Sequence, residues 1–371
     1  MLHRTLLHDS RRLFPRPLIL TGLLLSGLSG LVNANPPCEA ADGFVPICGV
    51  VAPEDLVRAP REGQVIFGQM AGRGGIYLLR TKDDLVEPLF AENKLAIDPA
   101  TGWGTPECPA PDQALHAHGI DLHQLRDGRW RLLAVNHAGR ESVEFLELTY
   151  SGDRPALTWR GCVLAPEDGN FNDVAGLADG DFLVTHMGSR ARGTWEAILA
   201  RVGFKTGVVY HWTADSGFAG VSGTDSRFPN GLILSADERT LYVNEYFGNR
   251  MLVVNWRDGE RSADVAVEKP DNLSWTRDGQ LLVASHHASL YALAKSLDLA
   301  EDEVSLLPYS IIAIDPQTLE RKTLLIHEGA PMGAGTVALD AGDRLYIGSY
   351  RGDRIVHVAM PEGTPGAATA E

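Results

Sequence analysis

Polar pairs of residues recur along the chain just ahead of short apolar stretches, and their side chains are those that bind hard metal ions. The six pairs are Glu54-Asp55, His118-Gly119, Asn172-Asp173, Asn230-Gly231, Asp271-Asn272 and Gly335-Thr336. They hold four carboxylates and three amides, but no lysine or arginine. Buried together, the carboxylates would repel one another at a cost on the order of several kcal/mol each. Ca²⁺ removes that cost, because it prefers carboxylate and amide oxygens.

Each pair also has a purely structural interpretation. Asn-Asp, Asp-Asn and Asn-Gly are common in turns, where their side chains bond to nearby backbone groups. Their recurrence at a similar distance before each turn favours one shared site over separate turns. Four negative charges would balance two Ca²⁺ ions.

A repeated strand unit explains how such distant pairs could meet. Six polar turns are each followed by an apolar, β-prone run, at 65–67, 132–135, 182–184, 241–243, 281–283 and 345–347. A period of roughly 40 to 65 residues with about four short strands per unit is typical of a β-propeller. Strands of a β-sandwich, the alternative, recur every ~8–12 residues without a longer period. We therefore predict an all-β, six-bladed β-propeller whose innermost strands bring all six pairs to one end of a central metal-binding channel.

The termini are predicted to lie outside the propeller. Four arginines precede an apolar run at 18–25, and small residues follow at 32–34, which is the pattern of a secretory signal over residues 1–34. The apolar run is short for a membrane anchor, which is the alternative. We expect an N-terminal strand or extension over 35–50, the propeller over 51–360 and a disordered tail over 361–371. The protein is then exported, and is periplasmic or extracellular.

The charge of the chain argues against two classes of partner. The formal net charge is −15, and it becomes −18 without residues 1–34, which hold four arginines and one aspartate. Such acidity disfavours nucleic acid and anionic lipid and suits cations. No later segment is long and apolar enough to cross a membrane, so we expect no stable membrane insertion after signal removal. The sequence leaves the oligomeric state open.

Other chemistries fit the sequence less well. The four cysteines permit two disulfides in three pairings and lack zinc-ligand spacing; they are Cys38, Cys48, Cys108 and Cys162. The chain after residue 34 contains no Gly-x-Ser-x-Gly nucleophile motif. His116 and His118 are spaced like two zinc ligands, but no strand–helix alternation surrounds them.

The segments around the pairs resemble those of a known family. The resemblance is to the calcium-dependent paraoxonase/arylesterase lactonases and, more distantly, to the gluconolactonase/senescence-marker propellers. It covers roughly residues 50 to 357, and its stretches are, in chain order, PEDLV, HAHGIDL, LLAVNHAGRESVEFLEL, FNDVAGL, FPNGLILSADERTLYVNE, KPDNLSWTRDGQLLVASHH and GTVALDAGDRLYIGS. Any one of them is a weak signal, whereas six blade openings in register are a strong one.

The resemblance implies roles for particular residues. A catalytic calcium near the top of the channel would be held by Glu54, Asn172, Asn230, Asp271 and Asn272. A deeper, structural calcium would be held by Asp55, Asp173 and the backbone carbonyl of Ile120. His118 and His137 match a histidine dyad proposed as the water-activating base, and His286 matches a further active-site histidine.

The charge count agrees with this division, because each ion receives two carboxylates. In a strand-leading pair such as Glu54-Asp55, neighbouring side chains point in different directions, so one can serve each ion. Five side-chain ligands leave the upper ion open positions for water and a carbonyl oxygen.

The chain also departs from the family. The family's long disulfide joins the N-terminal strand to the last strand, whereas the last cysteine of this chain is Cys162. Ring closure would then rest on strand pairing, alone or with a local Cys38–Cys48 disulfide. A long loop at 94–117 and a short helix within 288–306 are expected beside the pocket.

The predicted function is calcium-dependent hydrolysis of lactones or aryl esters, so the expected partner is a small-molecule lactone or ester. Glu54 or Asp271 is an alternative to the histidine dyad as the base. The alternatives in function are a sugar-lactone hydrolase of the gluconolactonase type and a calcium-stabilised propeller that binds without catalysis, since propellers often serve as platforms.

Overall fold

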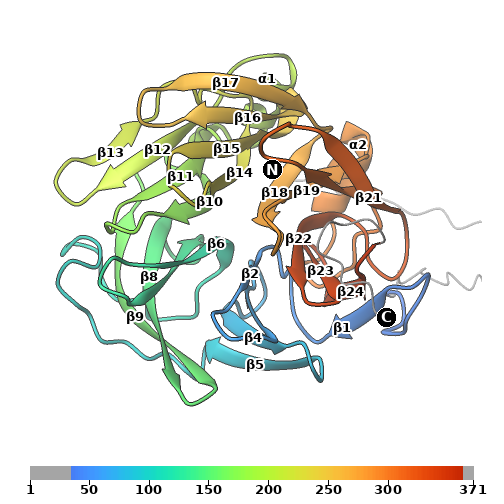
Figure 1. Cartoon of the computed structure of the whole chain (residues 1–371), viewed down its shortest axis with the longest axis horizontal. Helices are drawn as coiled ribbons and strands as arrows, with labels where there is room; N and C mark the ends of the chain where they lie inside the picture. Colours follow the sequence, from blue (N-terminus) through green and yellow to red (C-terminus); the bar gives the residue numbers. More distant parts are fainter. Residues whose placement is uncertain (1–34, 362–371) are drawn as a thin grey trace, which may run out of the picture. The chain divides into compact units, whose positions relative to one another are not determined.

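Strands of the described residues form six antiparallel sheets of four, arranged as blades around a common centre (Figure 1). The computed structural model describes residues 35–361, so the predicted signal at 1–34 and the tail beyond 361 lie outside the described residues. The sequence prediction of an all-β, six-bladed propeller is confirmed.

Each blade runs from an inner strand at the centre to an outer strand at the rim. Blades 1 to 3 are β2 (Leu56–Arg58), β3 (Gln64–Gly68), β4 (Ile76–Arg80) and β5 (Leu85–Phe90); β6 (Ala117–Gln124), β7 (Trp130–Asn136), β8 (Ser142–Ser151) and β9 (Arg154–Leu164); β10 (Phe171–Gly176), β11 (Phe182–His186), β12 (Val208–Thr213) and β13 (Gly217–Gly220). Blades 4 to 6 are β14 (Pro229–Leu234), β15 (Thr240–Glu245), β16 (Arg250–Asn255) and β17 (Glu260–Ala266); β18 (Pro270–Trp275), β19 (Leu281–His286), β20 (Tyr309–Ile314) and β21 (Arg321–His327); β22 (Gly335–Ala341), β23 (Arg344–Ser349), β24 (Arg354–Ala359) and β1 (Val45–Cys48).

The apolar core is divided among the interfaces between blades. The second strand of each blade is buried on both faces, as in 132–135 of β7, which is why its sequence is a continuous apolar run. Within residues 35–361, six apolar clusters each join two neighbouring blades, and the cluster with Leu56, Tyr346 and Ile355 joins blade 6 to blade 1. The ring is therefore closed by packing as well as by hydrogen bonds.

The N-terminal segment completes blade 6. β1 pairs antiparallel with β24, from Val45 opposite His357 to Cys48 opposite Arg354. The buried guanidinium of Arg354 donates to the carbonyls of Pro36 and Pro37, at 2.8 and 3.1 Å. A Cys38–Cys48 disulfide fixes the segment, so closure combines strand pairing with this local disulfide.

Short helices lie only in connections between strands in the described part of the chain. α2 (Leu290–Leu297) confirms the helix predicted within 288–306, and Ser289 caps it by accepting from the Ala292 N–H. α1 (Thr194–Arg201) and the short 3₁₀ turns η1 (Arg190–Arg192) and η2 (Tyr246–Gly248) were not predicted. No helix among residues 35–361 has the length and apolarity needed to cross a membrane.

The long connection before β6 is fixed against blade 2. Its backbone follows β9 through bonds such as Asp98 N–H to Trp159 O and Thr105 N–H to Cys162 O, and the Cys108–Cys162 disulfide fixes it there. Gly161 is required at this contact, since a Cβ would overlap the carbonyl of Trp103. The long loop predicted at 94–117 is present, with its first part held against the rim of blade 2.

Candidate functional site

The six polar pairs all lie at the starts of the inner strands, as predicted. Strand pairing is interrupted there: regular pairing of β10 with β11 stops between Phe171 and Val174, and it stops similarly in β6, β14, β18 and β22. Such irregularities free residues from the ladder and redirect their side chains. In blade 3 the freed residues are Asn172 and Asp173, which are both buried.

Direct contacts join the upper residues of different blades. Asn272 Nδ2 donates to Glu54 Oε1 at 2.8 Å, and Glu54 Oε1 lies 3.7 Å from His118 Nε2. Asn172 Nδ2 lies 3.3 Å from the same His118 nitrogen. Residues from blades 1, 2, 3 and 5 thus form one buried cluster, although more than two hundred positions separate Glu54 from Asn272 in the sequence.

Buried oxygens in this cluster lack hydrogen-bond partners. Among the described residues they include Glu54 Oε2, Asn172 Oδ1, Asn230 Oδ1 and Asn272 Oδ1. Leaving a buried polar atom unsatisfied costs roughly 1–3 kcal/mol, so four together need a common partner. A hard cation fits this set, since all four are carboxylate or amide oxygens. We call Glu54, Asn172, Asn230, Asp271 and Asn272 the upper ring.

The electrostatics of the upper ring also suit a cation. Burial raises the pKa of Glu54 well above its usual range, and the charges of Asp271 and Asp173 raise it further. Burial raises the pKa of Asp271 to about 8 despite a hydrogen bond from Asn230. Within residues 35–361 no group of three or more His, Cys, Asp or Glu side chains could hold a metal alone, so any site here depends on the amides.

Asp55 and Asp173 lie deeper and tie neighbouring blades together. Asp55 accepts from the N–H groups of Leu56 and Ile120, and Asp173 accepts from those of Val174 and Leu232, all at 2.8 Å. Burial raises the pKa of both carboxyls, and each is raised further by a neighbouring carboxylate, Glu54 for Asp55 and Asp55 for Asp173.

A cavity is lined by Asp55, Asp173 and residues that follow the polar pairs along the inner strands. It has a volume of about 300 Å³ and is lined by residues from all six inner strands, so it is the central channel. Asp55 and Asp173 line it, whereas no member of the upper ring does. Asp55 and Asp173 thus differ from the other predicted ligands in their exposure to the channel, and the division of the ligands between two ions stays a prediction. The Ile120 N–H contacts Asp55, but its carbonyl as a ligand stays a prediction.

His118 and His137, the residues of the predicted dyad, contact each other beside the upper ring. His118 Nδ1 and His137 Nε2 lie 2.8 Å apart, and His137 Nδ1 lies 2.8 Å from Glu141 Oε2. Burial lowers the pKa of His118 well below its usual value, and His137 lowers it further, so His118 is neutral near pH 7. The sequence did not single out Glu141.

His286 links three blades beside the upper ring. Its Nε2 lies 3.1 Å from the Gly335 carbonyl and 3.5 Å from Asp271 Oδ2, while Tyr246 OH lies 3.0 Å from its Nδ1. Burial lowers the pKa of His286 to about 4. The partners Tyr246 and Asn244, whose amide donates to the Asp271 carbonyl, were missed by sequence reasoning because both come from β15 or its end, outside the polar pairs.

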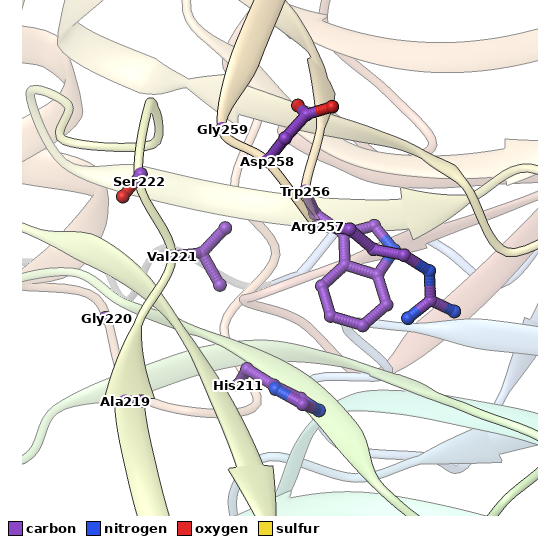
Figure 2. A pocket seen from close by; sticks show the side chains of 9 residues that line it. All are labelled: His211, Ala219, Gly220, Val221, Ser222, Trp256, Arg257, Asp258 and Gly259. Atoms are coloured by element: carbon purple, nitrogen blue, oxygen red, sulfur yellow. The ribbon is translucent and has the colours of Figure 1, made fainter.

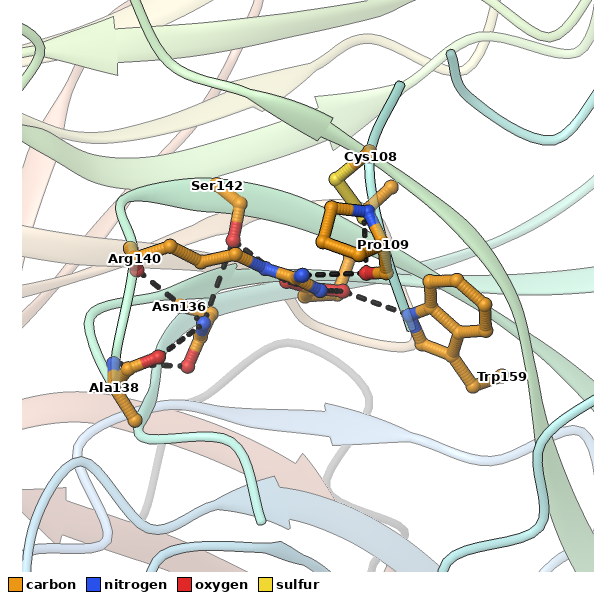
Figure 3. Close-up of a disulfide and its surroundings, with 9 residues drawn as sticks. Cys108, Pro109, Asn136, Ala138, Arg140, Ser142 and Trp159 are labelled. Carbon is orange, nitrogen blue, oxygen red and sulfur yellow. Dashed lines mark hydrogen bonds and ion pairs between the residues drawn. A yellow bond between two sulfur atoms is a disulfide. The ribbon is translucent and has the colours of Figure 1, made fainter. Parts of the chain in front are cut away.

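The turn that carries His137 is held by a second polar network (Figure 3). Asn136 Oδ1 accepts from the His116 and Ala138 N–H groups, at 3.0 Å each. Arg140 donates to the carbonyl of Pro109, next to the Cys108–Cys162 disulfide, and also to Glu144. These contacts connect the long loop before β6, the start of β6 and the β7–β8 turn. Both histidines of the dyad belong to these connected segments.

A cavity at the rim lies apart from this site (Figure 2). Its volume is about 370 Å³, and blade 3 and the β16–β17 turn line it with His211, Trp256 and Arg257 among others. Arg257 stacks on the Trp256 ring at 4.2 Å. None of the predicted site residues lines this cavity.

Gly119→Ala is expected to destabilise the protein by about 3 kcal/mol through overpacking. A Cβ at Gly119 would lie 2.3 Å from Asp173 Oδ1 and 2.5 Å from Asp173 Cα, so backbone of blade 3 would have to move. The measurement is the free energy of unfolding in urea. Gly220→Ala is the matched control, since its Cβ would meet only a Val208 methyl at 3.9 Å. Equal stability of the two variants would contradict close packing at the channel.

Comparisons with known proteins agree with the fold. Residues 131–293 match the family described as the SMP-30/Gluconolactonase/LRE-like region. No curated protein matches the chain.

Several solved structures are similar at a TM-score of 0.50. One is a putative gluconolactonase with 15% sequence identity, and the match covers 85% of this chain and 91% of that one. A luciferin-regenerating enzyme has 15% identity, and the match covers 84% of this chain and 92% of that one. A gluconolactonase from Xanthomonas campestris has 17% identity, and the match covers 89% of this chain and 96% of that one. At these identities the likeness establishes the propeller fold alone.

Proposed function

We propose that the protein is a calcium-dependent hydrolase of lactones or aryl esters. The observation that carries this proposal is the ring of unpartnered buried oxygens next to the His118–His137 pair. The family match over 131–293 and the gluconolactonases among the similar folds support a small lactone as the substrate class.

The upper ring would hold one Ca²⁺, and Asp55, Asp173 and the Ile120 carbonyl would hold a second. The upper ion, when bound, would polarise the ester carbonyl and stabilise negative charge on its oxygen. The deeper ion would be structural, because its ligands already join neighbouring blades.

The chain's own groups supply the proton transfers. His118 Nε2 takes a proton from water as the water oxygen bonds to the carbonyl carbon. When the bond from that carbon to the ring or ester oxygen breaks, the same proton passes to the leaving oxygen. Glu54, 3.7 Å from His118 Nε2, is the alternative base.

Two other functions are tested by the same experiment. A sugar-lactone hydrolase of the gluconolactonase type is favoured by the family match over 131–293. A binding propeller without catalysis would use the same calcium sites and turn over nothing.

The test is hydrolysis of a panel of alkyl γ- and δ-lactones, long-chain acyl lactones, a sugar lactone and phenyl acetate, with Ca²⁺, with chelator, and after Ca²⁺ is restored. Chelator-reversible hydrolysis of alkyl lactones or phenyl acetate supports the proposal. A strong preference for the sugar lactone favours the gluconolactonase type. No turnover of any substrate in Ca²⁺ would overturn both hydrolase assignments.

His118→Gln is expected to lower kcat by about 10²-fold, because it removes the general base. Steady-state kinetics on the best substrate of the panel measures this. His211→Gln, at the rim cavity, is the control and should keep full activity. Full lactonase activity of His118→Gln would exclude the dyad and leave Glu54 or Asp271 as the base.

We further propose that the protein works outside the cytoplasm, in the periplasm or beyond the cell. All four cysteines are paired, as Cys38–Cys48 and Cys108–Cys162, which supports an oxidising compartment. The predicted signal over 1–34 supports the same location. Fractionation of cells that express the full chain would test it, and retention in the cytoplasm would contradict it.

A further inference from the structure

We propose that Glu141 is a positioning residue that sets which nitrogens of His137 and His118 carry protons, and thereby leaves His118 Nε2 bare at the channel mouth. This inference rests on the proposed function for its catalytic meaning. The hydrogen-bond pattern itself is independent of that function.

Glu141 is fixed from three sides. Its Oε1 accepts from the Phe171 N–H at 2.6 Å, at the start of β10. Its Oε2 lies 3.1 Å from Arg190 Nη1 and 2.8 Å from His137 Nδ1. The carboxylate is nearly buried, with 8% of its side chain exposed, and a cation lies against it. It therefore has a single arrangement and acts as an acceptor.

The Glu141 carboxylate determines which ring nitrogen carries the hydrogen in His137 and, through His137, in His118. A carboxylate only accepts, so His137 Nδ1 must carry a hydrogen. In a neutral ring Nε2 is then bare, and it accepts from His118 Nδ1 at 2.8 Å. His118 Nδ1 thus carries the hydrogen of that ring, and His118 Nε2 keeps its lone pair.

The contact between His118 and Asn172 is consistent with this assignment of hydrogens. His118 Nε2 faces the Asn172 amide nitrogen at 3.3 Å, and an N–H can donate only to a bare ring nitrogen. Asn172 is thereby turned so that Oδ1, which has no partner, points elsewhere in the upper ring. One carboxylate on the β7–β8 turn thus orients both the base and a proposed metal ligand.

Glu141→Gln should reverse this pattern. The amide oxygen can stay on the Phe171 N–H, and the amide NH₂ then faces His137 Nδ1. His137 becomes an acceptor at Nδ1 and a donor at Nε2, and His118 must accept at Nδ1 and carry its hydrogen on Nε2. The base is then blocked while the shape of the site is kept. We expect kcat to fall by about 10²-fold with KM changed less than about twofold.

The experiment combines kinetics with NMR of the ring nitrogens in ¹⁵N-histidine-labelled full-length protein with Ca²⁺ at pH 7. Signals are assigned with His118→Gln and His137→Gln. Glu196→Gln is the matched control: Glu196 is also a buried carboxylate that accepts a backbone N–H, from Ser189, and faces Arg192, but neither His118 nor His137 is among its partners. The control should keep both kcat and the nitrogen pattern.

A bare His118 Nε2 in the unaltered protein, which becomes protonated in Glu141→Gln, supports the proposal. A protonated His118 Nε2 in the unaltered protein overturns it, as does an equal loss of kcat in Glu196→Gln. If no lactone is hydrolysed by any variant but the nitrogen pattern is as expected, the proposed function fails and the role of Glu141 in the histidine pair stands.

Discussion

Asp271→Asn is expected to lower the proposed lactone hydrolysis at least about 10³-fold relative to the unaltered chain, measured as kcat/KM in saturating Ca²⁺. Asp271 supplies one of the two negative charges of the upper ring, and burial in that ring raises its pKa to about 8. Asparagine keeps the size of the side chain and removes its charge. A metal's stabilisation of the transition state is worth several kcal/mol, and about 4 kcal/mol corresponds to about 10³ in rate.

The control for this variant is Asp215→Asn, a charge removal of the same kind at an exposed position between β12 and β13. It should keep full activity, which excludes a general effect of net charge. Activity of Asp271→Asn within about tenfold of the unaltered chain would mean that the upper ring does not act on the carbonyl.

Removal of Ca²⁺ is expected to be the largest perturbation of stability. A bound ligand stabilises by about 4 kcal/mol per site when its free concentration is about a thousand times Kd. Without the ions, the unpartnered oxygens and crowded carboxylates remain buried. The free energy of unfolding in urea should therefore fall by several kcal/mol in chelator and rise with the logarithm of the free Ca²⁺ concentration.

Glu54→Gln separates ion binding from general packing. Glutamine can still accept from Asn272 through its oxygen, and it removes a charge that Asp271 and Asp173 oppose. We expect this variant to be more stable than the unaltered chain in chelator and less stable in Ca²⁺. Stability curves that keep the same order in both conditions would rule out Glu54 as a ligand.

The sequence was sufficient for the architecture because the repeated signal is local. A polar turn followed by a run such as 132–135 marks the second strand of a blade, and the residue pair ahead of it marks the inner strand. Topology then brings the pairs together, so Glu54 and Asn272 could be assigned to one cluster before any distance was known. The short helix at 290–297 was predicted from its leucine spacing in the same way.

Contacts that depend on the course of loops could not be read from the sequence. Glu141 contacts a histidine four positions before it, but its other partners, Phe171 and Arg190, are 30 and 49 positions away. The Cys108–Cys162 pairing depends on the loop following β9, and three pairings were possible beforehand. α1 has only Glu196 and Ala200 buried, so it lacks the apolar stripe that would have signalled a helix.

Among the described strands, β1 is synthesised first, whereas its partner β24 is synthesised last. Until the chain's end is made, blade 6 is incomplete and the channel lacks its sixth wall. After a single proteolytic cut between β1 and β2, only the β1–β24 pairing and other non-covalent contacts would hold the segment that completes blade 6. Hydrogen bonds at Asn35 and Arg354 hold this segment in place, and the Cys38–Cys48 disulfide lies within it.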